Sequence, residues 1–314
     1  MTFFLFKNVE IRFQNKELEE QKQEIQEQAE ELRVANAHLE KALVEINEQK
    51  EQIEEQAMQI TDSIRYAKDI QFAILPSQAR IREAYPELFI LNQPRDIVSG
   101  DFYWYASHSG KDFLAVADCT GHGVPGALMS MVCNDFFDYS INEREIANVD
   151  EALNQVHKAV RIALKQDEKL NSDGMEVALC ALDREKKILE FAGAKRPLYY
   201  MQDGVMHEIR GDKKPIGGKQ KEKERRFTRH TIDVSKPTTF YIFSDGFQDQ
   251  FGGENGKKFM SQAFKNYLFK IHQEPMERQK ELLQMTLNDW MNPLGAKQPY
   301  KQIDDILVLG ARIL

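Results

Sequence analysis

Residues 113–123 read FLAVADCTGHG, an apolar run that leads into an acid and a glycine-containing turn. Five apolar residues run directly into Asp118, and glycines follow at Gly121 and Gly123. A short apolar run bounded by turn residues is typical of a buried β-strand. The stretch therefore predicts a strand over residues 113–118 whose last side chain is an acid beside a flexible turn.

Three other acids stand where a predicted strand begins or ends: Asp101, Asp245 and Asp304. Carboxylates at strand ends suit a shared site for a hard cation, because Mg²⁺ and Mn²⁺ prefer oxygen ligands. Two such ions can hold a bridging water and lower its pKa. For any single Asp-Gly pair an ordinary turn is the better interpretation. Four acids on separate segments favour a metal site.

The residues from about 84 onward alternate between β-rich runs and helical stretches. Many strands with few strand–helix–strand repeats predict an α+β domain built on antiparallel sheet, with helices packed outside. The expected strands are 113–118, 176–183, 187–191, 197–201, 226–234, 238–243 and 305–313. The expected helices are roughly 125–142, 150–166, 258–272 and 275–290.

The N-terminal part carries a heptad repeat. Every seventh position from 4 to 74 is apolar, a second seam four residues later is diluted with Asn and Lys, and no Gly or Pro precedes Pro76. This pattern predicts a parallel dimeric coiled coil, on the order of 105 Å long if helical over residues 4–74. A solitary charged helix is the alternative, but its apolar seam would face water. We therefore expect a coiled-coil dimerisation or signalling helix over residues 1–76 and a globular domain over residues 77–314. The rod is placed either to transmit a signal or to act as a passive dimeriser.

Composition excludes several classes of function. The first 75 residues carry 9 Lys and Arg against 16 Asp and Glu, and the net charge of the chain is −8, so nucleic acid and anionic membranes are poor partners. Three widely spaced cysteines without a CxxC pair indicate a reducing, cytoplasmic environment. The apolar opening, residues 1–6, is too short for a signal peptide or a membrane span. A membrane connection would require that an upstream segment had been removed.

Four motifs occur in the order used by PPM-type (protein phosphatase 2C superfamily) enzymes, and they look most like the bacterial SpoIIE/RsbU-like branch. They are SGDFY at 99–103, ADCTGHG at 117–123, FSDG at 243–246 and DDI at 304–306. The similarity runs from about residue 86 to residue 314. It implies an αββα sandwich of two antiparallel sheets and a centre of two Mn²⁺ or Mg²⁺ ions.

The resemblance also implies roles for individual residues. Asp101 and Asp118 would hold the metal pair, with Asp118 as the bridge, and the backbone carbonyl of Cys119 would ligate one ion. Asp245 and Asp304 would ligate the other ion. The phosphate-binding Arg of eukaryotic relatives stands five residues before the first Asp. Here Arg95 stands six before it, and it is carried as the candidate substrate-binding residue.

One further departure concerns the general acid. Eukaryotic relatives place a His two residues after the bridging Asp, where this chain has Thr120. His122 lies four residues after Asp118, and we expect it to have a structural role in a loop or at the start of a helix rather than to donate a proton.

The resemblance implies a metal-dependent phosphatase that removes phosphate from serine or threonine of a protein, with a metal-bound hydroxide attacking phosphorus. The partner expected by family analogy is a regulatory protein such as an anti-sigma-factor antagonist, and the coiled-coil homodimer would regulate activity. Two alternatives stay open. One is a signalling adaptor whose phosphatase-like domain has little or no activity, and the other is a hydrolase of small phosphoesters.

Overall fold

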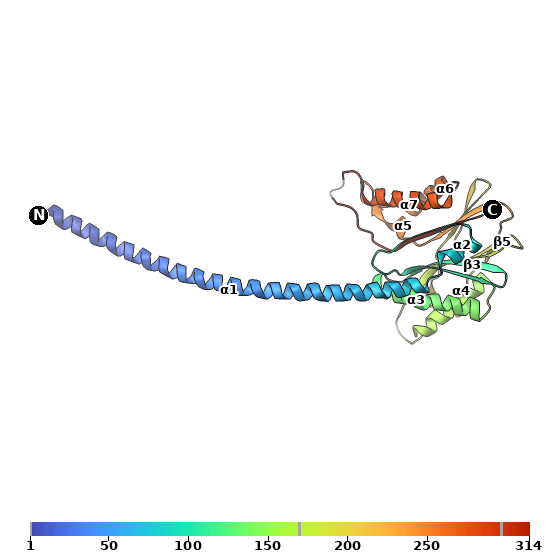
Figure 1. Cartoon of the computed structure of the whole chain (residues 1–314), viewed down its shortest axis with the longest axis horizontal. Helices are drawn as coiled ribbons and strands as arrows, with labels where there is room; N and C mark the ends of the chain where they lie inside the picture. Colours follow the sequence, from blue (N-terminus) through green and yellow to red (C-terminus); the bar gives the residue numbers. More distant parts are fainter. Residues whose placement is uncertain (1, 169–170, 296–297) are drawn as a thin grey trace. The chain divides into compact units, whose positions relative to one another are not determined.

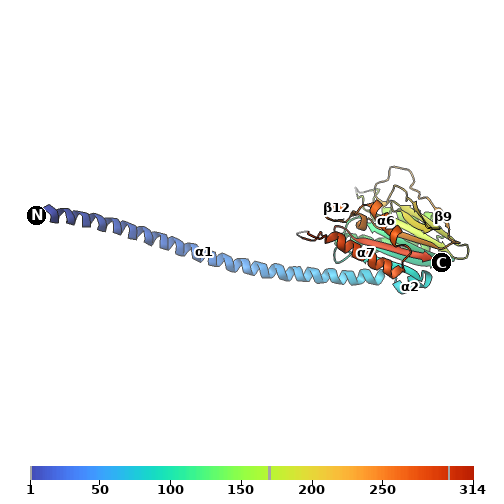
Figure 2. The ribbon, with the colours of Figure 1, turned by 90° about the horizontal axis from the view of Figure 1, so that it is seen from above.

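The computed structural model describes residues 2–168, 171–295 and 298–314, and the chain divides into two compact units that meet at Ser63 and Ile64. One helix, α1 (Thr2–Ile74), forms the first unit and extends into the second. Figure 2 shows it as an uninterrupted ribbon. The helix expected from the heptad repeat is therefore confirmed. Its pairing with a second copy remains a prediction.

The surface of α1 explains why a partner is expected. Seam residues Ile25, Leu32 and Ile53 each have more than 60% of their surface exposed in the single chain. Ion pairs one turn apart, such as Lys16–Glu20 at 3.8 Å, add only slight support to an exposed helix. None of the helices in the described parts of the chain is long and apolar enough to cross a bilayer.

The second unit is a layered α+β domain. Its helices are α2 (Gln78–Ala84), α3 (Gly123–Asp138), a π-helical turn (Tyr139–Glu143), α4 (Val149–Ala163), α5 (Gly246–Asp249), α6 (Ser261–Ile271) and α7 (Met276–Met291). Its strands are β1 (Glu87–Gln93), β2 (Asp101–His108), β3 (Lys111–Cys119), β4 (Gly174–Asp183), β5 (Ile188–Ala194), β6 (Leu198–Gln202), β7 (Val205–Ile209), β8 (Ile216–Gly217), β9 (His230–Asp233), β10 (Thr238–Phe243), β11 (Phe251–Gly252), β12 (Lys257–Lys258) and β13 (Ile306–Ile313).

The strands form two large antiparallel sheets and one small hairpin. The first sheet has the order β1-β13-β10-β6-β7, and the second has the order β2-β3-β4-β5-β9 with β8 beside β4. The hairpin consists of β11 and β12. In Figure 1, α3 and α4 lie on one side of the sheets and α6 and α7 on the other. This arrangement confirms the expected αββα sandwich.

Three buried apolar clusters hold the four layers together. The first lies between α3, α4 and the β2–β5 sheet, the second lies between the two sheets, and the third lies between the β10–β13 sheet and helices α6 and α7. Phe137, Leu114 and Phe264 are fully buried representatives of the three clusters, in that order. Burial of each such side chain stabilises the fold by roughly 1.5–3 kcal/mol.

Strand β3 shows how the sequence encodes the layers. Phe113, Ala115 and Ala117 face the helical cluster, and Leu114 and Val116 face the other sheet. Successive side chains of a strand point to opposite faces, so a strand covered on both sides has no polar alternation. The continuous apolar run before Asp118 is the consequence.

Some expected boundaries were wrong. The strand expected at 226–234 begins only at His230, because the preceding backbone is bound by side chains instead of a neighbouring strand. The N–H of Phe227 donates to Asn154 at 3.0 Å, and that of Thr228 donates to Asp212 at 2.7 Å. The helix expected at 125–142 ends as α3 at Asp138 and continues as a π-helical turn.

The last turns of α1 belong to the globular unit. Gln71, which the heptad pattern places in the diluted seam, has only 6% of its surface exposed. Its side-chain amide donates to the carbonyl of Ser99 at 2.7 Å and to the hydroxyl of Ser130 at 2.8 Å, and its oxygen accepts from the N–H of Ser99 at 3.2 Å. The end of α1 is therefore tied to α3 and to the segment that leads into β2.

A buried histidine on α4 gives the domain a predictable dependence on pH. Nδ1 of His157 accepts the N–H of Gly217 at 2.9 Å, and Nε2 lies 2.8 Å from Oε1 of Gln220, so the ring is a neutral tautomer that donates from Nε2. Burial lowers the pKa of His157 to about 4. In the unfolded chain the pKa of a histidine is about 6.5, so between these values the unfolded state binds the extra proton.

We expect the free energy of unfolding to fall as the pH drops from about 6.5 to 4, with His157 contributing up to ~1.4 kcal/mol per pH unit. Urea unfolding at pH 7 and pH 5 measures this for the native chain and for His157→Gln. The variant should lose less stability over that interval, although it starts less stable. Equal losses in both proteins would contradict this assignment.

Candidate metal centre

Asp101 and Asp118 face each other across two neighbouring strands. Asp101 begins β2, Asp118 is the penultimate residue of β3, and the two are register partners. Asp101 has 4% of its surface exposed, and its buried Oδ2 has no hydrogen-bond partner. An unpartnered buried carboxylate oxygen is costly, so this pair calls for a cation.

Asp245 and Asp304 come from the other sheet. Asp245 stands two residues after β10, and Asp304 stands two residues before β13. Because these strands are antiparallel neighbours, the end of one and the start of the other lie at the same edge of the sheet. The N–H of Ser244 donates to the carbonyl of Leu307 at 2.9 Å and closes this edge. The fold thus brings both acids to one place.

The acids of the two sheets act on one another electrostatically. Burial, with repulsion from Asp118 next in size, raises the pKa of Asp101 well above its usual range. Burial raises the pKa of Asp118 to about 7; Arg196 opposes the shift, and Asp245 and Asp304 add to it. Burial and the neighbouring acids also raise the pKa of Asp304. The four predicted ligand acids therefore form one cluster of excess negative charge.

Arg196 is the cation inside this cluster, and the sequence did not reveal it. Its Nη2 lies 3.1 Å from Asp118, 2.7 Å from Asp245 and 2.5 Å from Glu176, and its side chain is only 7% exposed. Glu176 belongs to β4, where it is the register partner of Asp118. The loop between β5 and β6 delivers Arg196. No motif in the sequence marks the loop Lys195-Arg196-Pro197 for this role. The position of Glu176 beside Asp118, by contrast, follows from the pairing of β3 with β4.

Cys119 contributes its backbone and not its thiol. The side chain is buried in the helical cluster near Cys133, and the hydrogen bond with Cys133, followed by burial, raises the pKa of its thiol well above the usual range. The carbonyl remains its candidate ligand atom. Gly100 and Gly126 pack against the carbonyl of Gly121 so closely that an added Cβ would lie 2.5 and 2.3 Å from that oxygen. This packing fixes the turn after Asp118 against the start of β2.

The adjacent acids Asp304 and Asp305 have different tasks. The Asp305 carboxylate is buried and accepts the N–H of Arg95 at 2.8 Å and that of Gly100 at 2.7 Å, so it braces the segment before Asp101. In the part of the chain that the structure describes, Oδ1 of Asp304 accepts a hydrogen bond only from the N–H of Asp305. This difference supports Asp304 as the ligand.

Arg95 and His122 lie at the rim of the cluster. The Arg95 guanidinium donates to the carbonyl of Ile303 at 3.0 Å and is one-third exposed. His122 precedes α3 without a side-chain capping bond, and its Nδ1 lies 3.1 Å from the Asp96 carboxylate. His122 thus lies at the start of α3 and pairs with Asp96, the residue at the position where eukaryotic relatives carry an Arg, while its side chain makes no capping bond to the helix.

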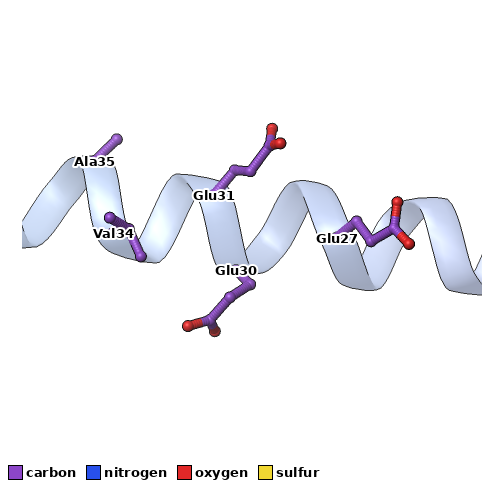
Figure 3. A pocket seen from close by; sticks show the side chains of 5 residues that line it. All are labelled: Glu27, Glu30, Glu31, Val34 and Ala35. Carbon is purple, nitrogen blue, oxygen red and sulfur yellow. The ribbon is translucent and has the colours of Figure 1, made fainter.

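The donor set fits a hard divalent cation, because it consists of carboxylate oxygens and one available carbonyl. Within the described residues no three His, Cys, Asp or Glu side chains already converge as a complete ligand group. Three carboxylates, those of Asp118, Glu176 and Asp245, instead contact Nη2 of Arg196. The acidic side chains of Glu27, Glu30 and Glu31 on α1 do not meet at one point in this way (Figure 3). Figure 3 shows Glu30 and Glu31 projecting from opposite sides of that helix.

Comparisons with known proteins agree with this geometry. Residues 108–314 match the sequence family described as Stage II sporulation protein E (SpoIIE). The phosphoserine phosphatase RsbU of Bacillus subtilis (strain 168) is 24% identical over 194 residues, which make up 60% of this chain and 54% of RsbU. The chain therefore spans about half the length of this curated relative.

Solved structures extend the likeness to three dimensions. The SiaA-PP2C domain of Pseudomonas aeruginosa is 34% identical and superposes with a TM-score of 0.72, covering 82% of this chain and 98% of that domain. The catalytic domain of the serine threonine protein phosphatase PstP, solved with two manganese ions, is 12% identical with a TM-score of 0.52, over 72% of this chain and 98% of that domain. At that identity the second likeness concerns the fold alone.

Proposed function

The chain belongs to the Stage II sporulation protein E (SpoIIE) family, and from that premise we propose that it is a divalent-metal-dependent phosphatase acting on phosphoserine or phosphothreonine of a protein. The observation that carries this proposal is the cluster of Asp101, Asp118, Asp245 and Asp304 at one edge of two sheets. RsbU, a phosphoserine phosphatase by name, supports the choice of reaction.

Two Mn²⁺ or Mg²⁺ ions, when bound, would supply an activated water and neutralise charge that develops on the phosphoryl group. Asp101 and Asp118 would bind the pair of ions, and the carbonyl of Cys119 would bind one of the two. Asp245 and Asp304 would bind the other ion of the pair. Asp305 would keep the loop before Asp101 in position. Arg95, one-third exposed at the rim, remains the candidate for binding substrate phosphate.

A protein substrate fits the position of the site. The carboxylates of Asp118 and Asp245 are 22% and 32% exposed, so the cluster opens at the edge of the sandwich. An open edge suits a phosphorylated side chain on a macromolecule better than a small ester, which a deep pocket would enclose. By analogy with RsbU, the partner is proposed to be a regulatory protein of the anti-sigma-factor-antagonist kind in the cytoplasm.

Regulation through the coiled coil is part of the proposal. Residues 1–76 are proposed to form the dimerising helix and residues 77–314 the phosphatase domain. The hydrogen bonds between Gln71 and Ser99 support a link, because Ser99 in turn accepts the N–H of Asp101 through its hydroxyl at 3.0 Å. A change at the end of α1 would therefore reach a proposed metal ligand through one residue.

Phosphate release from matched phosphoserine, phosphothreonine and phosphotyrosine peptides, and from an aryl phosphate, tests the function. We expect release from the first two peptides with Mn²⁺ or Mg²⁺ and its loss in excess EDTA, because the acids need a divalent ion to bind phosphate. Restoration by fresh metal controls for unfolding. Metal-saturated protein that cleaves no substrate but retains a phosphoprotein would instead favour the adaptor. Cleavage of the aryl phosphate alone would favour a small-ester hydrolase.

A further inference from the structure

One nitrogen of Arg196 occupies the centre of the acidic cluster. Nη2 alone contacts three carboxylates at 2.5–3.1 Å, and these come from Asp118 of β3, Glu176 of β4 and Asp245 after β10. Two of the three are proposed metal ligands, and the contacting atom of each is its Oδ2. A metal ion that binds these same oxygens would therefore come close to this nitrogen.

The arrangement differs from an ordinary arginine ion pair. A guanidinium has five N–H donors in a planar fork and usually divides its partners among them. Here a single nitrogen serves three acids, and the buried Nε has no hydrogen-bond partner. Burying a charge in this way costs free energy unless it neutralises other charges that the fold has already buried. The carboxylates that surround Nη2 are the charges that Arg196 neutralises.

We propose that Arg196 is the resident cation of the acidic cluster when no metal is bound, and that a divalent ion binds by displacing its guanidinium from Asp118 and Asp245. The inference rests on the proposed function, because it takes these two acids as metal ligands. A carboxylate oxygen can bind a metal ion and accept a hydrogen bond at once, but a divalent ion shared by both Oδ2 atoms would lie beside the guanidinium charge and repel it. Metal binding is then an exchange of one cation for another.

The displaced guanidinium can stay paired with Glu176. This residue makes the shortest of the three contacts and is not among the proposed ligands. Arg196 therefore keeps one carboxylate partner after the exchange and stays beside the metal centre. The exchange has two consequences: repulsion within the metal-free cluster is reduced, and the affinity for metal is lower than the acids alone would provide.

The test measures metal binding without substrate or turnover. Apoprotein is titrated with Mn²⁺, and the free hexaaqua ion is followed by electron paramagnetic resonance for the native chain and for Arg196→Gln. We expect the Kd for Mn²⁺ to fall by about tenfold or more in the variant, because no internal cation competes. Without metal, the Tm of Arg196→Gln should be roughly 5 °C below that of the native chain. Saturating Mn²⁺ should make this difference in Tm smaller.

Lys195→Gln is the matched control. Lys195 carries the same charge one residue earlier and contacts the other oxygen of Glu176 at 2.6 Å, but its side chain is 43% exposed. Loss of this screened charge should change the Kd by less than about threefold. If Lys195→Gln tightens Mn²⁺ binding as much as Arg196→Gln, general electrostatics explains the effect and the inference is overturned.

The other outcomes are equally distinct. Mn²⁺ binding that is unchanged or weaker in Arg196→Gln would overturn the inference while leaving the metal centre intact. A native chain that binds no Mn²⁺ would overturn the proposed function together with the inference. If Arg196→Gln does not fold, Arg196→Met replaces it, because methionine has an unbranched side chain without a charge. Arg196→Met must likewise bind Mn²⁺ more tightly than the native chain does.

Discussion

Replacing Asp118 with Asn is expected to lower the Mn²⁺-dependent rate of phosphoserine peptide hydrolysis by at least about a thousandfold in kcat. Asp118 is the proposed bridge between two ions, so its loss affects both of them. An amide offers one neutral oxygen in place of two charged ones, and hard cations bind it much less well. The comparison is made by measuring phosphate release at saturating peptide and saturating metal.

The folded state should tolerate this change. Burial raises the pKa of Asp118 and the neighbouring acids add to the shift, so a neutral isostere removes repulsion while it loses the contact with Arg196. We expect the free energy of unfolding without metal to stay within about 1 kcal/mol of the native value. Asp112→Asn is the matched control, because it makes the same change on β3 far from the cluster and should leave kcat unaltered. A fully active Asp118→Asn enzyme would remove Asp118 from the mechanism.

Much of the fold could be predicted because its signals are local. The strand expected at 238–243 matches β10 residue for residue, since its six residues are all buried and end at a turn. The range of β2 was not predicted, although Asp101 was expected to stand at a strand end. Its aromatic run after Asp101 carries no alternation, because Tyr103 faces the other sheet while Phe102 and Trp104 face the helices. Both faces are apolar, so periodicity could not mark it.

The candidate site was predictable only where residues lie in ordered motifs. Asp101, Asp118, Asp245 and Asp304 follow from strand ends and from family resemblance. Arg196 does not, because its role depends on two sheets meeting at one edge, which no local pattern encodes. The same holds for Asp305, whose carboxylate is bound by two backbone N–H groups some two hundred positions earlier in the chain. Long-range contacts of this kind become visible only in three dimensions.

Replacing Leu32 and Leu39 together with Lys is expected to convert the full-length chain from a dimer to a monomer. Both leucines belong to the apolar seam, and they are 64% and 60% exposed on the single chain. In a parallel pair each would be buried against its counterpart, at roughly 1.5–3 kcal/mol per side chain. Lysines at these positions would place like charges opposite one another. Sedimentation equilibrium at micromolar concentrations measures the change in mass.

Val34 and Val44 provide the matched control for this experiment. They are also apolar, exposed at 47% and 57%, and lie on α1 outside the seam, so replacing both with Lys adds the same charge without touching the proposed contact. We expect this second variant to remain a dimer. A monomeric native chain would refute the pairing outright, and a dimer that survives both seam lysines would place the contact elsewhere. The heptad repeat predicts contact through the seam and not through other apolar positions. The coiled coil is therefore supported only if the seam variant is monomeric while the Val34 and Val44 variant stays dimeric.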